Sequence, residues 1–129
     1  MACEFESRLG HQKSNVQQIK KGVIVATIHI KEGQFENEVL KAKEPVIVDF
    51  YADWCGPCKI MEPIFDQLSI KYEGKIKFAK LDVDKYQSVA IEYGVMSIPT
   101  LIIFKDGKSI DNMMGLQDES SLSKKLDLL

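Results

Sequence analysis

The chain has 129 residues, of which 45% are hydrophobic and 28% charged, and its formal net charge is −2. This length fits one domain with a single core, and the small net charge gives no electrostatic reason to expect nucleic acid or an anionic membrane surface as a partner. No apolar run approaches the roughly 18 residues that span a bilayer, and the polar start does not resemble a signal peptide. We therefore expect a soluble monomer with no membrane span and no nucleic-acid partner.

The first third of the chain begins with a polar, weakly periodic segment. We interpret residues 1–21 as an N-terminal extension, disordered or partly helical from Asn15 to Lys21, and residues 22–129 as the folded domain. The β-branched run from Val23 to Ile30 predicts a strand. From Gln34 to Lys43, apolar residues at helical spacing predict an amphipathic helix.

The middle of the chain carries the strongest patterns. The nearly continuous apolar run from Val46 to Tyr51 is typical of a strand buried on both faces. After it, a helix from about Cys55 to Tyr72 is predicted, with Pro63 inside it, where we expect a kink near Lys59. The apolar stripe of this helix consists of Ile60, Met61, Ile64, Phe65, Leu68 and Tyr72.

The last third predicts alternating helices and strands that end in a hairpin. The expected elements are a strand at Ile76–Val83, a helix at Tyr86–Tyr93, a strand at Thr100–Lys105, a strand from about Ser109 to Met114, and a helix at Glu119–Leu128. Asp106 and Gly107 are expected to turn the hairpin, and Ser120 or Asp118 to cap the final helix. Strands separated by helices predict an α/β fold, a mixed sheet with helices on both faces.

The cysteines form a close pair and one outlier. Cys55 and Cys58 lie three positions apart, and Cys3 stands alone near the start. Such a pair can bind a metal, form a structural disulfide or perform redox chemistry. The two histidines, His11 and His29, are too few and too scattered to complete a structural zinc site, so no metal is expected. An odd and small number of cysteines also argues against a secreted disulfide scaffold.

The position of the pair favours redox chemistry. Cys55 falls where a buried strand ends and a helix begins, and the unpaired N–H groups of a helix N-terminus stabilise a thiolate, which is the nucleophilic form. Cys58 lies one turn further on the same face, so it can form or resolve a disulfide with Cys55. Gly56 and Pro57 keep the turn compact. We expect Cys55 to be the exposed attacking thiol and Cys58 the buried resolving thiol.

Asp49 interrupts the buried strand VIVDFY. A buried carboxylate costs several kcal/mol unless it is paired or protonated, so its pKa is expected to rise. Lys80, in FAKLDVD on the predicted neighbouring strand, is the basic residue placed to partner it. We therefore hypothesise that Asp49 relays a proton to or from Cys58 during exchange. The alternative, an aspartate pointing at solvent, fits poorly in a strand buried on both faces.

Several of these motifs resemble one known family, the thioredoxins. The matching segments are VDFYADWCGPCK at Val48–Lys59, Pro63, AKLDVD at Ala79–Asp84, YGVMSIPTLIIFKDGK at Tyr93–Lys108, and Gly115 before the last helix. They occur in the family's order and spacing across about residues 23–129, and WCGPC followed by IPT is highly specific.

The resemblance implies the thioredoxin fold, with a five-stranded mixed sheet in the order 1-3-2-4-5, and a cis bond before Pro99 facing the disulfide. It also implies site roles: Cys55 as nucleophile, Cys58 as resolving thiol, and Asp49 with Lys80 as a buried proton-handling pair. Substrate is implied to lie across Trp54, Gly56, Pro57, Ile98, Pro99 and Gly115, with its backbone pairing to Ile98 as an added strand. From the residues alone, the isomer at Pro99 remains open.

The family resemblance also implies a reaction and its partners. A Cys55 thiolate attacks a protein disulfide, a mixed disulfide forms, and Cys58 releases the reduced product. The expected partners are disulfide-containing proteins and a thioredoxin reductase or other electron donor. No cofactor is expected, because the chain carries no flavin or nicotinamide motif. The function is protein-disulfide reduction, in electron transport and redox homeostasis, and the expected location is the cytoplasm.

Three features depart from the family pattern. Tyr51 stands where many members have tryptophan, and Leu116 follows Gly115 where a small residue is common. The N-terminal extension carries Cys3. One interpretation is a tail with an unreactive thiol, and the other is an exported, envelope-anchored or periplasmic lipoprotein whose signal peptide is missing from this sequence.

Two other functions stay open at this point. An oxidase or isomerase on the same fold usually carries a dipeptide other than Gly56-Pro57 between its cysteines. A redox-inactive binding subunit would have no need of the reactive residues, all of which are present.

Overall fold

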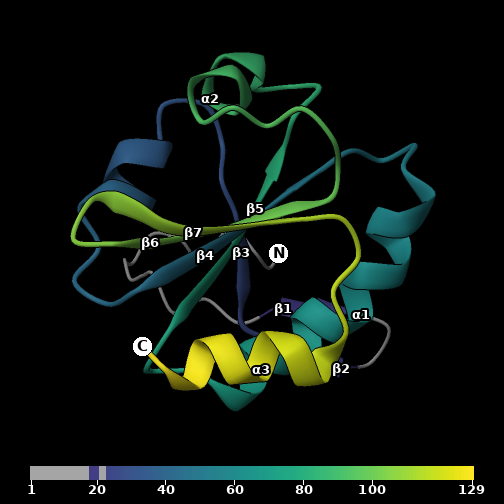
Figure 1. Ribbon diagram of the computed structural model, residues 1–129, viewed down its shortest axis with the longest axis vertical. Helices are drawn as coiled ribbons and strands as arrows, with labels where there is room; N and C mark the ends of the chain where they lie inside the picture. The colour runs from purple at the N-terminus through teal and green to yellow at the C-terminus, as the bar shows by residue number, and fades with distance from the viewer. Residues whose placement is uncertain (1–17, 21–22) are drawn as a thin grey trace.

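The computed structural model describes residues 18–20 and 23–129 of the chain. Its centre is a five-stranded sheet, in which β4 is the middle strand (Figure 1). The strands, in spatial order, are β3 (Thr27–His29), β5 (Lys77–Asp82), β4 (Val46–Tyr51), β6 (Thr100–Lys105) and β7 (Lys108–Met114). β5 pairs in parallel with β3 and β4, and the β4–β6 and β6–β7 pairs are antiparallel. Counted along the chain within this sheet, the order is the predicted 1-3-2-4-5.

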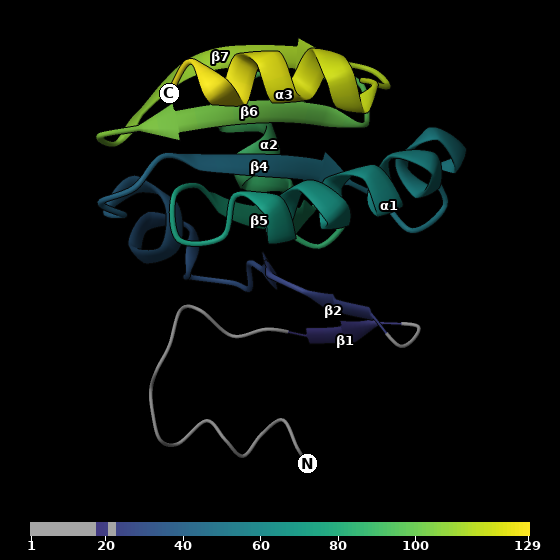
Figure 2. The ribbon, with the colours of Figure 1, turned by 90° about the horizontal axis from the view of Figure 1, so that it is seen from below.

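Helices cover both faces of the sheet, as predicted. Figure 1 shows α1 (Gly56–Lys71) and α3 (Glu119–Asp127) on one side and α2 (Gln87–Glu92) on the other. Figure 2, viewed from below, shows α1 and α3 in front of the strands. A π-helical turn, η3 (Glu36–Leu40), shares the α2 side. No helix in the described part of the chain is long and apolar enough to cross a membrane.

Alternation along the strands produces two cores, one on each face. The core under α1 and α3 includes Ile47, Phe65, Phe78, Leu101 and Leu122. The core under α2 and η3 includes Val39, Val48, Phe50, Leu81 and Phe104. Because both faces of β4 are covered, its side chains from Val46 to Phe50 are all buried, as the continuous apolar run predicted.

The strand predicted from Val23 to Ile30 is two strands in different sheets. β2 (Val23–Val25) pairs with β1 (Gln18–Lys20), and β3 pairs with β5. Between them, the backbone N–H of Ala26 donates to Ser69 Oγ on α1, at 3.2 Å, instead of to a neighbouring strand. This bond marks the point where the chain passes from one sheet to the other. The helix suggested for Asn15–Lys21 is wrong for Gln18–Lys20, and its remaining residues lie outside the described part.

The helix predicted from Gln34 to Lys43 is only the short turn η3. Lys77 Nζ, on β5, donates to the backbone carbonyl of Glu38 at 2.8 Å. In an α-helix this carbonyl would accept the N–H of Ala42, which donates instead to Val39. The neighbouring strand therefore takes the acceptor that a longer helix would need.

The remaining elements match their predictions within one or two residues, with smaller corrections. Ile60 is not part of the buried stripe of α1 and is 56% exposed, because it lies about 100° around the helix from Met61. Asp118, not Ser120, caps α3: its Oδ1 accepts the Ser121 N–H at 2.7 Å. Leu129 is half-buried rather than fully inward.

The predicted hairpin turn between β6 and β7 is confirmed. Asp106 and Gly107 both have positive φ, 54° and 81°, as the twist-matched two-residue hairpin turn requires. Lys105 and Lys108 pair on either side of it.

Candidate functional site

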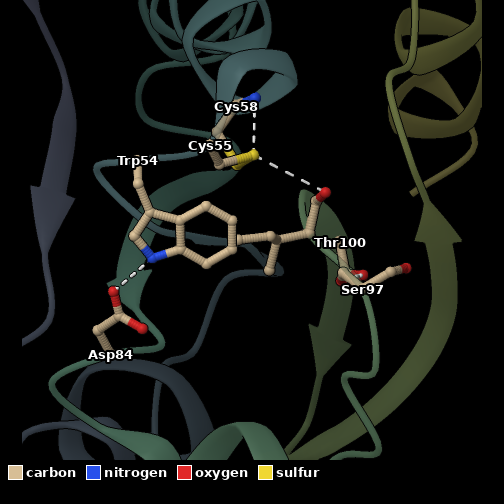
Figure 3. Close-up of a disulfide and its surroundings, with 7 residues drawn as sticks. Trp54, Cys55, Cys58, Asp84, Ser97 and Thr100 are labelled. Atoms are coloured by element: carbon tan, nitrogen blue, oxygen red, sulfur yellow. Dashed lines mark hydrogen bonds between the residues drawn. A yellow bond between two sulfur atoms is a disulfide. The ribbon is translucent and has the colours of Figure 1, made fainter.

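The cysteine pair lies where β4 hands over to α1. Cys55 is the N-cap residue of α1, and its Sγ accepts a hydrogen bond from the backbone N–H of Cys58, with 3.2 Å between the two atoms (Figure 3). The two residues form a disulfide, with their Cα atoms 5.3 Å apart, inside the usual range for such bonds. Pro57 occupies the first turn, where a missing N–H costs no helical bond. The sulfur of Cys55 thus takes the place of the side-chain oxygen that usually caps a helix.

The predicted difference in exposure between the two cysteines is wrong for this disulfide form. Both residues are 4% exposed. In a disulfide, each sulfur covers the other, so exposure does not separate their roles. Hydrogen bonding does: the Sγ of Cys55 receives the Cys58 N–H and lies 3.8 Å from the carbonyl oxygen of Ile98.

The loop before β6 faces the disulfide, and its Ile98–Pro99 bond is cis, as the resemblance implied. Thr100 Oγ1 donates to the carbonyl of Ser97 at 2.6 Å and closes this loop (Figure 3). The N–H of Gly115 donates to the Pro99 carbonyl at 2.8 Å. Gly115 has φ of 84°, a conformation that glycine adopts without steric cost. Three predicted substrate residues, on two loops, are thereby brought together.

Apolar side chains lie open around this loop. Met96 is 91% exposed, Met114 66%, and Leu116 49%. Leu116, one of the departures from the family pattern, therefore adds apolar surface beside Gly115. The sequence reasoning did not single out the two methionines, although both are adjacent or nearly adjacent to predicted substrate residues.

Trp54 is 70% exposed and is held by one acidic residue. Its Nε1 donates to Oδ2 of Asp84 at 2.7 Å (Figure 3). Asp84 is itself oriented because its backbone N–H donates to Oδ1 of Asp82 at 2.9 Å. Sequence reasoning missed this contact. The available signal was the second aspartate of AKLDVD, which the motif included without a role.

Asp49 is buried behind the disulfide, and its Oδ1 has no hydrogen-bond partner among the described residues. Burial raises the pKa of this carboxyl to about 7, because the charged form loses its hydration. The positive charge of Lys80 opposes this rise, and the negative charge of Asp66 adds to it. The predicted rise in pKa is therefore present in the folded chain.

Lys80 is the direct neighbour of Asp49 across the β4–β5 pair. Its ammonium nevertheless turns to α1, where Nζ lies 3.3 Å from Glu62 Oε2 and 3.7 Å from Asp66 Oδ1. It also lies 6.0 Å from the centre of the Tyr51 ring. Sequence reasoning missed both carboxylates, although their i, i+4 spacing places them on one face of the predicted helix.

A pocket of about 290 Å³ joins these groups to Cys58. Its wall includes Asp49, Tyr51, Cys58, Glu62 and Lys80. A buried carboxyl group that titrates near neutral pH, next to a cysteine, can accept or supply a proton there. Among the described residues, no cluster of histidine, cysteine, aspartate and glutamate is arranged to hold a metal ion.

The chain was compared with known proteins. The family model described as Thioredoxin matches residues 26–128. Thioredoxin 1 of Nostoc sp. is 43% identical over 102 residues, which cover 79% of this chain and 95% of that protein. The thioredoxin of Staphylococcus aureus is 44% identical over 103 residues, covering 80% and 97%, and that of Pseudomonas aeruginosa is 43% identical over 100 residues, covering 78% and 93%.

These relatives and the disulfide at the start of α1 point to the same chemistry. The alternatives of an oxidase, an isomerase and a redox-inactive subunit are not favoured by them. The chain therefore belongs to the thioredoxin family and is a protein thiol-disulfide oxidoreductase.

Proposed function

We propose that the protein acts as a reductant of protein disulfides and that Cys55 is its nucleophile. The observation that carries this proposal is the bond from the Cys58 N–H to the Cys55 sulfur at the N-terminus of α1. In the dithiol form, the same N–H and the helix dipole favour a thiolate on Cys55. Cys58 provides its own N–H to this bond, and no N–H bond to the Cys58 sulfur is found among the described residues. The asymmetry supports different roles for the two thiols.

The reaction proceeds in two exchanges. The Cys55 thiolate attacks one sulfur of the substrate disulfide, a Cys55–substrate bond forms, and the other substrate sulfur leaves as a thiolate that takes up a proton. Cys58 then loses its proton and attacks Cys55, which releases the second substrate thiol and forms the Cys55–Cys58 disulfide. Two electrons pass from the protein to the substrate. A thioredoxin reductase or another donor returns them.

Asp49 is proposed to take the proton from Cys58 in the second exchange, with Lys80 modulating its charge. Its burial, its pKa of about 7 and the shared pocket with Cys58 support this role. Lys80 supports it as the nearest positive charge on the adjacent strand.

Substrate is proposed to bind across the groove of Trp54, Gly56, Pro57, Ile98, Pro99 and Gly115, with its backbone paired to Ile98. The exposed apolar side chains of Trp54, Met96 and Met114 support a docking surface for an extended, partly apolar segment. We propose that residues 22–129 form the domain, that it works as a monomer, and that it acts in the cytoplasm, the compartment in which a reductant of disulfides is kept reduced.

The proposal is tested by trapping the intermediate. With insulin as the disulfide substrate and a dithiol as electron donor, the wild type should accelerate reduction and Cys55→Ser should abolish this acceleration. Cys58→Ser should instead accumulate a Cys55–substrate adduct, which mass spectrometry detects. An adduct on Cys58 in the Cys55→Ser variant, at a rate equal to that of Cys58→Ser, would reverse the assigned roles.

The direction of electron flow requires a second measurement. Equilibration of the pair with a thiol buffer should give a potential well below that of glutathione. A potential near or above that of glutathione would identify an oxidant or isomerase instead.

A further inference from the structure

The charged groups around Asp49 divide between two sides of the pocket. From the sheet, β3 presents His29, β5 presents Lys80, and β4 with its following loop presents Tyr51 and Asp53. From the helix, α1 presents Cys58, Lys59, Glu62 and Asp66. Lys80, Lys59 and a protonated His29 are the possible positive charges in this set, and Lys80 is the one aligned with Asp49 in the strand register.

Lys80 does not use this alignment to form an ion pair. Its nitrogen lies within 4.0 Å of Glu62 and Asp66, and no ion pair joins it to Asp49 in the described part of the chain. Asp49 Oδ1 correspondingly has no partner there, although Asp49 is only 1% exposed. An unpartnered carboxylate oxygen next to a buried lysine requires a reason, because an Asp49–Lys80 pair would satisfy both groups.

Glu62 supplies that reason. Of the two helix carboxylates it is the nearer to Lys80 Nζ, 3.3 Å against 3.7 Å for Asp66. It lies one helical turn beyond Cys58 and one turn before Asp66, so the three side chains share the face of α1 that is turned to the sheet. Lys80 has one ammonium group, and the geometry that serves Glu62 withdraws it from Asp49.

We propose that Glu62 is a positioning residue for the redox reaction: it holds the Lys80 ammonium on the α1 side of the pocket, so that Asp49 lacks the ion pair that would fix its carboxyl in the ionised form. Glu62 itself touches neither the disulfide nor the substrate groove in this arrangement. It acts through Lys80, and it keeps the carboxyl beside Cys58 able to gain and lose a proton. The inference rests on the proton-transfer role proposed for Asp49.

The test is the titration of the Asp49 carboxyl carbon, followed by NMR in the full chain in its disulfide form. In Glu62→Gln, Lys80 is free to approach Asp49, and its midpoint should fall by about one pH unit or more, since an opposite charge at roughly 4 to 6 Å lowers a carboxyl pKa by about 1 to 3. The control is Glu44→Gln, which removes the same charge from an exposed site at the other end of β4. Its midpoint should equal that of the wild type. An unchanged or higher midpoint in Glu62→Gln would overturn the proposal.

Two further variants separate positioning from simple charge. Glu62→Asp keeps the charge but shortens the side chain, so it should lower the midpoint as Glu62→Gln does; a midpoint equal to that of the wild type would show that only the charge matters. In a Lys80→Met background, Glu62→Gln should shift the midpoint by less than half as much as it does when Lys80 is present. A full shift there would mean that Glu62 acts on Asp49 directly, and it would overturn the proposal. If Lys80→Met does not fold, Glu62→Asp decides alone.

The pH dependence of disulfide exchange distinguishes this inference from the role of Asp49. If Asp49 transfers the proton, the acidic limb of the exchange profile of Glu62→Gln should move to lower pH together with the NMR midpoint. If the midpoint moves and the profile does not, Glu62 positions Lys80 as proposed, and the proton-transfer role of Asp49 is wrong.

Discussion

The two faces of the central strand β4 are built from different chemistry. On the α2 side, Val46, Val48 and Phe50 are all apolar and fully buried along the length of the strand. On the α1 side, Ile47 is apolar, but Asp49 follows it and Tyr51 completes the row towards the cysteines. The neighbouring strand β5 repeats the division, because Ala79 and Leu81 lie on the α2 side whereas Phe78 and Lys80 lie on the α1 side.

The difference separates stability from chemistry within one sheet. The α2 face gains free energy from every side chain that it buries. The half of the α1 face nearest the cysteines instead buries groups that carry charge, and it accepts the cost of removing them from water. Three predictions test this division, ordered by the size of the expected effect.

On the apolar face, Phe50→Ala should cost about 3 to 5 kcal/mol in free energy of unfolding, because Phe50 is fully buried and its removal leaves a cavity. Denaturant unfolding of the disulfide form measures this loss. The midpoint potential of the folded protein should stay that of the wild type, since the side chain points away from the cysteines. A loss below about 1 kcal/mol, or a changed potential, would contradict the division between the faces.

On the other face, Asp49→Asn should improve stability at high pH. The pKa of Asp49 is about 7 in the folded chain, against an ordinary value of 3.8 for an aspartate exposed to water, as it is after unfolding. Between these values the folded chain binds a proton that the unfolded chain releases, so the wild type loses stability as pH rises from about 4 to 7. This interval corresponds to about 4 kcal/mol at roughly 1.4 kcal/mol for each pH unit.

The measurement compares the free energy of unfolding at pH 5 and pH 8. Between these two pH values the wild type should lose about 2 to 3 kcal/mol more than Asp49→Asn, and a parallel loss in both proteins would show that Asp49 is not the group responsible. Glu44→Asn serves as the control, because an exposed carboxyl of ordinary environment should leave the difference between the two pH values as in the wild type.

The sequence predicted what depends on periodicity and on local chemistry. The buried run around Asp49, the helix cap at Cys55 and the β6–β7 turn each need only neighbouring residues for their interpretation. What the sequence did not predict depends on contacts between distant segments. Lys77 shortens the predicted helix at Gln34–Lys43 through its bond to Glu38, 39 residues away, and Ser69 on α1 divides the predicted strand at Ala26.

The site divides in the same way. The reactive pair and the acidity of Asp49 follow from one strand and the start of one helix. The partners of Lys80 do not, because their selection requires the distance between β5 and the face of α1. The exposure of Cys55 was wrong because it was inferred for a free thiol, whereas the disulfide makes each sulfur cover the other.

The smallest expected effect concerns the exposed edge of the active site, where Asp84 holds Trp54. Asp84→Ala should cost no more than about 1 kcal/mol, because the bond is solvent-exposed and water replaces it on loss. The ring should nevertheless become more mobile. Trp54 is the only tryptophan of the chain, so its fluorescence anisotropy reports on this ring alone and should fall in the variant.

Asp53→Ala is the matched control for that experiment, since it removes an exposed carboxylate next to Trp54 without touching the bond. Its anisotropy should remain that of the wild type. If both variants loosen the ring equally, the general charge near the loop, and not the bond to Asp84, holds it in place. If only Asp84→Ala does, and insulin reduction slows with it, the polar side of the sheet extends its control from the buried proton to the outer wall of the substrate groove.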